Sequence, residues 1–270
     1  MQAEQRARAI VEVVRERGFQ TIESLAGEFG VTPQTIRRDV NALNDEGLLR
    51  RRHGGVELPQ QGENLAYPAR QQLNPAAKRA IAQLVAQDIP ARASLFIGIG
   101  TTPELCALAL VHHPLLRVMT NNLNVVKRLA HNPDCELVVA GGRVRNLDLD
   151  VVAGEAHDFF SRFSVDIGIF GVGAVAPDGT LLDFSLDEVA MRESLMRHCR
   201  QRYLVVDHSK FERDATVRGG HITDATAVYS DRPLPPTIRA MLAAAGVRLV
   251  LPADATNNIS QVSLTPGECP

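Results

Sequence analysis

The stretch TPQTIRRDV, residues 32–40, decides how the N-terminal part of this chain folds. Thr32 is a preferred helix N-cap, and Pro33 suits the first helical position because its missing N–H is not needed there. We therefore expect a helix over residues 33–46, which Gly47 ends. On a 3.6-residue period this helix is amphipathic, with polar side chains on one face and apolar side chains on the other.

Two shorter helices are expected before this one. The apolar residues that recur there at helical spacing are Ala7, Ile10, Val11 and Val14. Gly18 follows them as a stop signal for the first helix. Thr21 is suited to cap a second helix over residues 22–28, and Gly30 supplies the turn after it. Three short helices in this order predict a helix-turn-helix.

The third helix has the polar face that a DNA-reading helix needs. Gln34, Arg37 and Arg38 share this face, close to the N-terminus that enters the major groove. Glutamine pairs with adenine and arginine with guanine, and a good bidentate contact discriminates between bases by roughly 1–3 kcal/mol. The alternative is a small helix bundle whose arginines are a solvated face, and an isolated Arg pair would favour it. The assembled pattern favours sequence-specific DNA binding.

Residues 48–58 have strand-like ends around Gly54 and Gly55, which predicts a β-hairpin, or wing, with a Gly-Gly turn. Three consecutive arginines in it are suited to contact phosphates or an adjacent minor groove. The residues expected to contact DNA are Thr32, Gln34, Thr35, Arg37, Arg38, Arg50, Arg51 and Arg52.

The length of 270 residues indicates two domains, since ~100–200 residues per domain is usual. We assign residues 1–58 to the winged helix-turn-helix and residues 59–74, which are rich in Pro, Gly, Gln and Asn, to a linker. Residues 75–252 form a larger domain, and residues 253–270 are a polar, flexible tail.

Composition excludes several classes of protein. No run approaches the ~20 apolar residues of a membrane span, and the N-terminus lacks the apolar core of a secretory signal, so we expect a cytoplasmic protein without a membrane partner. The four cysteines are scattered without metal-ligand spacing, so no metal site or disulfide framework is expected. A net charge of −2 argues against a general polyanion binder and leaves room for a small basic face.

Helical stretches alternate with short apolar strands in the larger domain. The helices are expected at residues 76–88, 103–112, 123–131, 186–200 and 236–245. The strands are expected at residues 94–99, 117–120, 136–140, 165–172, 203–207, 227–230 and 247–251. This alternation predicts an α/β domain with a mostly parallel sheet and helices on both of its faces.

A phosphate site is expected where residues 96–104 pass from an apolar strand through a Gly-Thr-Thr turn into a helix. Exposed N–H groups and the helix dipole attract an anion there, although such a turn alone is as often structural. Other polar groups follow neighbouring strands, and ligands collect at the carboxyl ends of strands in such sheets. The expected effector-binding residues are Gly100, Thr101, Thr102, Thr120, Asn121, Asn122, Gly141, Gly142, Asp207 and Lys210.

Two other functions fit the sequence less well. Residues 171–176 satisfy a GxGxxA dinucleotide-binding pattern, but residues 177–179 turn the chain where a helix should begin, so no cofactor is expected. Acidic groups such as Asp183, Asp187 and Glu188 are available to a phosphosugar isomerase. No pair of carboxylates has a spacing that compels catalysis, and an enzyme would not need the attached winged helix, so we expect no enzyme activity.

The N-terminal segment resembles the DeoR-type helix-turn-helix. The residues that carry the resemblance are Arg6, Ile10 and Val14, then Thr32 with residues 35–40, and the Arg-rich wing ending at residues 53–55. The resemblance marks residues 33–40 as the recognition helix. It also implies that Asp39 positions a nearby Arg or backbone group, and that His53 is a turn residue.

The larger domain is similar to the DeoR-family sensor domain at residues 100–104, 120–125 and 205–211. That resemblance implies a fold related to ribose-5-phosphate isomerase, a repressor that a phosphorylated sugar or polyol releases from its operator, and a dimer or tetramer. Within the family the chain is similar to the branch that responds to glycerol 3-phosphate. Gly98 departs from the family pattern, which has an Asp facing the pocket at that position.

Overall fold

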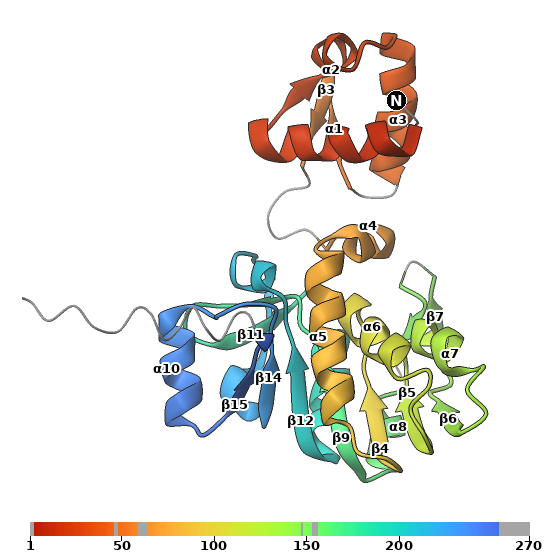
Figure 1. Cartoon of the computed structure of the whole chain (residues 1–270), viewed down its shortest axis with the longest axis vertical. Coiled ribbons are helices and arrows are strands. Elements are labelled where there is room, and N and C mark those ends of the chain that lie inside the picture. The colour runs from red at the N-terminus through yellow and green to blue at the C-terminus, as the bar shows by residue number, and fades with distance from the viewer. Residues whose placement is uncertain (1–2, 46–47, 59–63, 147, 153–155, 254–270) are drawn as a thin grey trace, which may run out of the picture. The chain divides into compact units, whose positions relative to one another are not determined.

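A computed structural model describes residues 3–45, 48–58, 64–146, 148–152 and 156–253 (Figure 1). The chain divides into two compact units, Met1–Leu73 and Asn74–Pro270. Gly47 and residues 59–63 and 254–270, on which we made predictions, lie outside the described residues.

The first unit contains the three expected helices. They are α1 (Ala3–Arg17), α2 (Ile22–Phe29) and α3 (Pro33–Asp45). Thr21 caps α2 by accepting a hydrogen bond from the backbone of Ser24, and Gly30 ends this helix in the left-handed region at φ 62°. The apolar faces meet in one core whose members include Ile10, Val14, Leu25, Ile36, Val40 and Leu43.

The wing is a three-stranded sheet of order β1-β3-β2, made of β1 (Gln20–Thr21), β3 (Gly55–Glu57) and β2 (Arg50–Arg52). The predicted hairpin is confirmed, but a Gly-Gly turn is wrong. Arg52 pairs with Gly55, so the turn is formed by His53 and Gly54 and Gly55 already belongs to β3. A Cβ at Gly55 would overlap the carbonyl oxygen of Gln20, because β1 approaches closely there.

The part of the chain that we predicted to be an aperiodic linker contains a helix, α4 (Tyr67–Gln72). Pro68 stands in its first turn, where no N–H is required, and Tyr67 and Ala69 are buried. Six residues are too few for a helical period to be visible in the sequence.

The second unit is built on a seven-stranded parallel sheet of order β15-β14-β12-β9-β4-β5-β6. The strands are β4 (Ser94–Ile97), β5 (Leu116–Thr120), β6 (Cys135–Val139), β9 (Val165–Phe170), β12 (Cys199–Val205), β14 (Ala227–Tyr229) and β15 (Arg248–Val250). The predicted α/β class with a mostly parallel sheet is confirmed.

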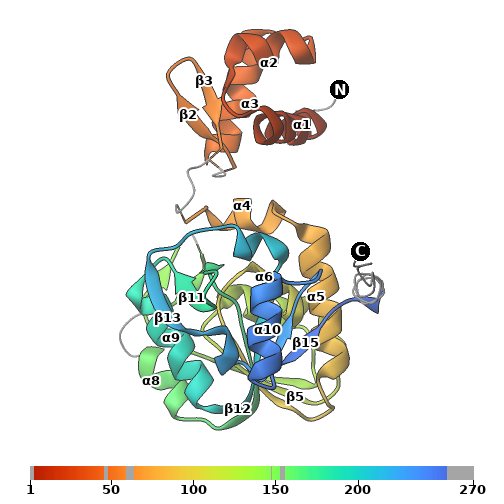
Figure 2. The same cartoon turned by 90° about the vertical axis from the view of Figure 1, so that its left-hand side faces the viewer.

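Helices cover both faces of this sheet (Figure 2). One face carries α5 (Pro75–Asp88), α6 (Thr101–Ala109) and α7 (Leu123–Leu129). The other carries α8 (Ala156–Ser161), α9 (Leu186–Arg197) and α10 (Pro236–Ala244). Alternate side chains of each strand therefore enter different cores: Leu95 and Ile97 pack with α5 and α6, and Phe96 packs with α8.

Several short elements were not predicted. Besides β1 and α8, they include the hairpin β7 (Val144–Arg145) with β8 (Asp150–Val151), an antiparallel sheet of β10 (Ala174–Val175), β11 (Thr180–Asp183) and β13 (Val217–His221), and the 3-10 helices η1 (His208–Phe211) and η2 (Ile222–Asp224). The GxGxxA stretch contains β10, so it lacks the helix that a dinucleotide site requires.

Candidate functional site

The exposed face of α3 carries the three side chains expected to read bases. Gln34, Arg37 and Arg38 are exposed, whereas Ile36 and Val40 on the opposite side are buried. The core therefore fixes the rotation of the helix about its axis and leaves the polar face to solvent.

Thr32 and Thr35, also expected at the DNA, bond to each other at the start of α3. The Thr35 backbone N–H donates to Thr32 Oγ1 at 3.3 Å, and the two hydroxyl oxygens lie 3.0 Å apart. Thr32 thus acts as the helix cap while remaining exposed.

An ion pair joins α3 to α1. Arg6 Nε donates to Asp39 Oδ2 at 2.6 Å, and Arg6 Nη2 donates to Asp39 Oδ1 at 3.3 Å. The positioning role expected for Asp39 is therefore present in the structure. This bidentate contact holds the helix from the side opposite to the solvent-facing arginines.

The wing arginines differ in their surroundings. Arg51 Nη1 donates to Asn41 Oδ1 at 2.8 Å, and its backbone N–H donates to Asn44 Oδ1 at 3.2 Å, so these contacts fasten the wing to α3. Arg52 pairs with Glu57 across the hairpin at 2.7 Å. Arg50 is half-buried. The two asparagines were missed in the sequence, where polar residues late in a helix resemble an ordinary solvated face.

In the second unit, the strand order groups the residues expected to bind an effector. Parallel strands bring their carboxyl ends to the same edge of a sheet. Residues 98–102 follow β4, residues 120–122 end β5 and begin α7, and residues 207–210 follow β12. These strands belong to the part of the sheet with the order β12-β9-β4-β5-β6, in which β4 is the central strand. Gly141 and Gly142 follow the edge strand β6, where both are exposed.

The N-terminus of α6 has the features of an anion site. This helix begins at Thr101, two residues before Pro103, where we expected it to start. Gly100 is its N-cap at φ 116°, and no side chain of the described residues caps it. The first N–H groups of a helix have no partner within it, and those of Thr101 and Thr102 point out of the first turn. By contrast, α7 and α9 are capped by side chains.

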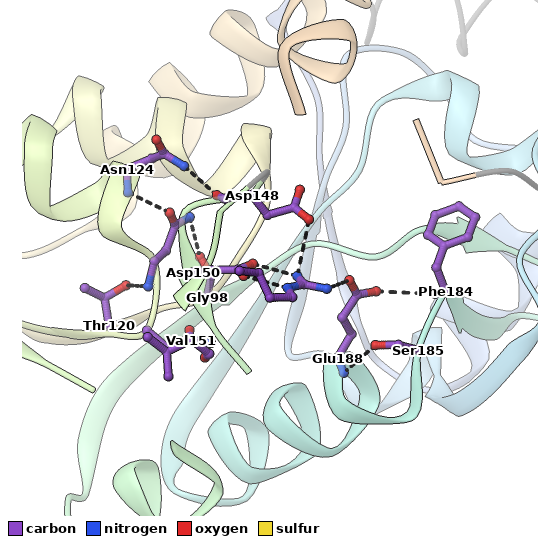
Figure 3. A network of polar contacts seen from close by, with 12 residues as sticks. Gly98, Thr120, Asn124, Asp148, Asp150, Val151, Phe184, Ser185 and Glu188 are labelled. Carbon is purple, nitrogen blue, oxygen red and sulfur yellow. Dashed lines mark hydrogen bonds and ion pairs between the residues drawn. The ribbon is translucent and has the colours of Figure 1, made fainter. Parts of the chain in front are cut away.

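The side chains at the end of β5 connect this strand to its neighbours (Figure 3). Thr120 Oγ1 donates to the Ile97 carbonyl at 2.6 Å, and Asn122 Nδ2 donates to the Gly98 carbonyl at 3.2 Å. Asn121 Nδ2 donates to the Val151 carbonyl at 2.8 Å. Thr120 and Asn122 therefore fix the loop that leads to α6.

Asp207 lies buried after β12 and organises the groups around it. Its Oδ1 accepts hydrogen bonds from Asn74 Nδ2 at 3.0 Å and from the Ser209 N–H at 3.1 Å. Burial alone would raise the pKa of Asp207, but the nearby charges of Lys210 and Lys78 and the hydrogen bonds donated by the side chains of Ser209 and Asn74 lower it below its usual value. Lys210 Nζ also donates to the Gly173 carbonyl at 3.4 Å, which joins the ends of β12 and β9.

Lys78, which was not predicted to belong to the site, is buried on α5. It shares the inward face of this helix with Ile81, Ala82 and Val85. A lysine in phase with an apolar face is the signal that would have identified it.

Comparisons with known proteins agree with these two units. The DeoR-like helix-turn-helix domain matches residues 6–62, and the DeoR C terminal sensor domain matches residues 73–232. The chain belongs to the DeoR family of transcriptional regulators. It is 41% identical to the glycerol-3-phosphate regulon repressor of Escherichia coli over 93% of this chain and 100% of that protein. The repressor of the same name from Haemophilus influenzae is 43% identical over 83% of this chain and 88% of its own length.

These relationships confirm the family predicted from the sequence, and its likeness to the glycerol 3-phosphate branch. A further relative, the HTH-type transcriptional repressor CsqR of Escherichia coli, is 35% identical over 91% of this chain and 94% of its own. Because these relatives are named transcriptional repressors and align with most of this chain, which carries a helix-turn-helix domain, the chain is a regulator and not an isomerase.

Among solved structures, ribose 5-phosphate isomerase A from Methanocaldococcus jannaschii aligns with 51% of this chain and 55% of its own, with a TM-score of 0.38 and 15% identity.

Within the described ranges, none of the helices combines the length and apolar character needed to cross a bilayer. In the same ranges, no group of three or more His, Cys, Asp or Glu side chains is arranged to hold a metal ion.

Proposed function

We propose that this regulator is a repressor that occupies an operator when free of ligand and leaves it when a phosphorylated polyol or sugar binds. The first effector to test is glycerol 3-phosphate, since two relatives at 41% and 43% identity are named repressors of the glycerol-3-phosphate regulon. Operator DNA lies in the cytoplasm, where we place the protein.

The observation that carries the effector proposal is the uncapped start of α6 at the sheet edge. Thr101 and Thr102 are buried there, with N–H groups and hydroxyls suited to phosphate oxygens. Lys210 supplies a positive charge from the end of β12 at the same edge. In this proposal Thr120, Asn121, Asn122 and Asp207 shape the site, while Gly141 and Gly142 border it.

For the DNA contact we propose that α3 reads bases and the wing contacts the backbone. Gln34, Arg37 and Arg38 are the base-reading residues, because they are exposed on the face of α3 that faces away from the core. Arg50, Arg51 and Arg52 supply cations in the wing. One recognition helix reads only a half-site, so we propose a homo-oligomer, a dimer or tetramer, on a symmetric operator.

A gel-shift assay with promoter DNA flanking the gene tests this function. The full chain is titrated onto the DNA, and the complex is then challenged with glycerol 3-phosphate, a panel of sugar phosphates and inorganic phosphate. We expect a specific protein–DNA complex, which glycerol 3-phosphate dissociates at a lower concentration than the sugar phosphates or inorganic phosphate do. A complex that none of the phosphorylated compounds affects contradicts the proposal.

A further inference from the structure

A cavity opens at the carboxyl ends of β4 and β9, on the side of the sheet that α8 and α9 cover. Its walls combine apolar side chains such as Phe170 and Leu195 with polar groups of the second unit. The polar residues in the lining are Asn121, Asp183, Glu188 and Arg192.

Three buried polar atoms of this lining have no hydrogen bond to the described residues: Asn121 Oδ1, an acceptor, and the donors Arg192 Nε and Nη1. Nη1 forms an ion pair with Asp183, which leaves Asn121 Oδ1 and Arg192 Nε without a partner of either kind. Asn121 is 1% exposed and Arg192 is 6% exposed. A buried polar atom without a partner costs stability, so such atoms in the wall of one cavity indicate a ligand that supplies the missing partners.

Arg192 is held in place by its other nitrogens. Nη1 pairs with Asp183, and Nη2 donates to the carbonyl of Gly219. Burial lowers the pKa of the Arg192 guanidinium to about 10, so it remains charged at neutral pH. Asp183 is fixed in turn, because its Oδ1 accepts a hydrogen bond from the Gly173 N–H at 2.7 Å. The donor is therefore oriented before any ligand arrives.

Glu188, one of the two acidic residues of the lining, is paired with Arg145 of the hairpin β7–β8 (Figure 3). Arg145 Nη1 donates to Glu188 Oε1 at 2.7 Å, while Arg145 Nε and Nη2 donate to Asp150, each at 2.7 Å. Asn121 bonds to the same hairpin through Val151. The lining residues thus include one donor, Arg192 Nε, and one acceptor, Asn121 Oδ1, without a partner among the described residues, and a hydroxyl group can satisfy both because it donates and accepts.

The cavity is a neighbour of the phosphate site. Gly171 lines it, and a Cβ on Gly171 would lie 3.6 Å from Pro103 Cδ in the first turn of α6. Gly98 lines it too and precedes the N-cap of α6 by two residues. A Cβ on Gly98 would lie 3.4 Å from Leu195 Cδ1, so a side chain there would point toward the cavity wall. Glycine at this position leaves the space open.

We propose that this cavity binds the hydroxyl-bearing end of the effector, with Arg192 Nε and Asn121 Oδ1 as its hydrogen-bond partners. The inference rests on the proposed function, in which the phosphate of the same molecule lies at the start of α6. The cavity then selects phosphorylated polyols and sugars over inorganic phosphate.

Calorimetric titration of the full chain with glycerol 3-phosphate, glucose 6-phosphate and inorganic phosphate tests the inference. The test variant is Asp183→Asn with Arg192→Gln, which removes both charges together and leaves no unpaired buried ion. Gly98→Val is a second variant that fills the cavity and removes no polar partner. The matched control is Arg117→Gln with Glu136→Gln, an exposed pair at 2.7 Å.

The wild type is expected to bind at least one organic phosphate about tenfold or more tightly than inorganic phosphate. Both cavity variants should lose most of this preference for organic over inorganic phosphate, and the control should keep it. Equal weakening of all three ligands in folded variants would overturn the inference and leave the proposed function standing. A wild type that binds the three ligands equally would overturn the inference and also contradict the preference for glycerol 3-phosphate that the proposed function expects. A wild type that binds none of the three would overturn the proposed function and the inference with it.

Discussion

Arg6 and Asp39 stand 33 positions apart in the sequence and are joined by two hydrogen bonds, at 2.6 and 3.3 Å. Their side chains are only 10% and 11% exposed. This pair connects α1 to α3, so the orientation of the face that we propose to read bases depends on a contact on another side of the helix.

Removing the carboxylate should therefore lower both stability and operator affinity. Asp39→Ala leaves the Arg6 guanidinium without its partner, which destabilises the first unit. We expect a lower midpoint of thermal unfolding and weaker operator binding. Glu28→Ala breaks the more exposed pair with Arg17 and is the matched control, for which little change is expected. Equal effects of the two substitutions would contradict the role assigned to Asp39.

Arg37→Ala and Arg38→Ala should each weaken binding to the specific operator by about tenfold, since a bidentate base contact is worth roughly 1–3 kcal/mol. Fluorescence anisotropy with operator and scrambled duplexes measures the loss, which should be larger for the operator. Arg8→Ala, an exposed arginine of α1, is the control. If both α3 variants leave the operator footprint and affinity unchanged, the base-reading assignment is wrong.

Substitution of two glycines of the first unit by alanine should change the stability of the protein in opposite directions. Gly55→Ala places a methyl group against the Gln20 carbonyl and the Phe19 ring, so the wing must shift and the unfolding midpoint should fall. Gly27 lies exposed within α2 with nothing near its Cβ position, so Gly27→Ala should stabilise by about 0.5–1 kcal/mol. Chemical denaturation of the two variants measures both effects, and a Gly55→Ala protein as stable as the wild type would contradict the close approach.

Substitutions at the proposed phosphate site should impair release of the operator by the effector and leave operator binding itself unchanged. Thr101→Ala and Lys210→Ala should bind the operator normally but need about tenfold more glycerol 3-phosphate for half-release, because each removes a group proposed to hold the phosphate. Lys127→Ala, an exposed lysine on α7, is the control for charge. Normal release from both site variants would mean that the phosphate binds elsewhere.

The features that could be predicted from the sequence are those encoded locally. Thr21 and Thr32 cap their helices, and alternation of helices and strands reveals a parallel sheet, whose carboxyl ends then group residues far apart in the chain. The antiparallel sheet was missed because its strands are two to five residues long and pair across long separations, as Thr180 does with His221. Periodicity cannot be seen in such short segments.

The parts of the site that were missed depend on burial rather than on residue type. Lys78 and Arg192 are charged residues on helices, and in the sequence they resemble solvated positions. Tertiary packing buries them, to 3% and 6% exposure, and only then do their partners become defined. Asn121 was chosen because it follows a strand, but the sequence does not indicate which of its amide atoms remains unpaired.

In the proposed function, one chain couples binding of the operator to binding of a phosphorylated effector. Linkage requires the coupling to be reciprocal: the factor by which glycerol 3-phosphate weakens operator affinity must equal the factor by which the operator weakens glycerol 3-phosphate affinity. The decisive measurement is calorimetric titration of glycerol 3-phosphate into the free protein and into its operator complex. We expect binding to the complex to be weaker by roughly 5–150-fold, the usual range of such coupling. Equal affinity for the two forms would contradict the account.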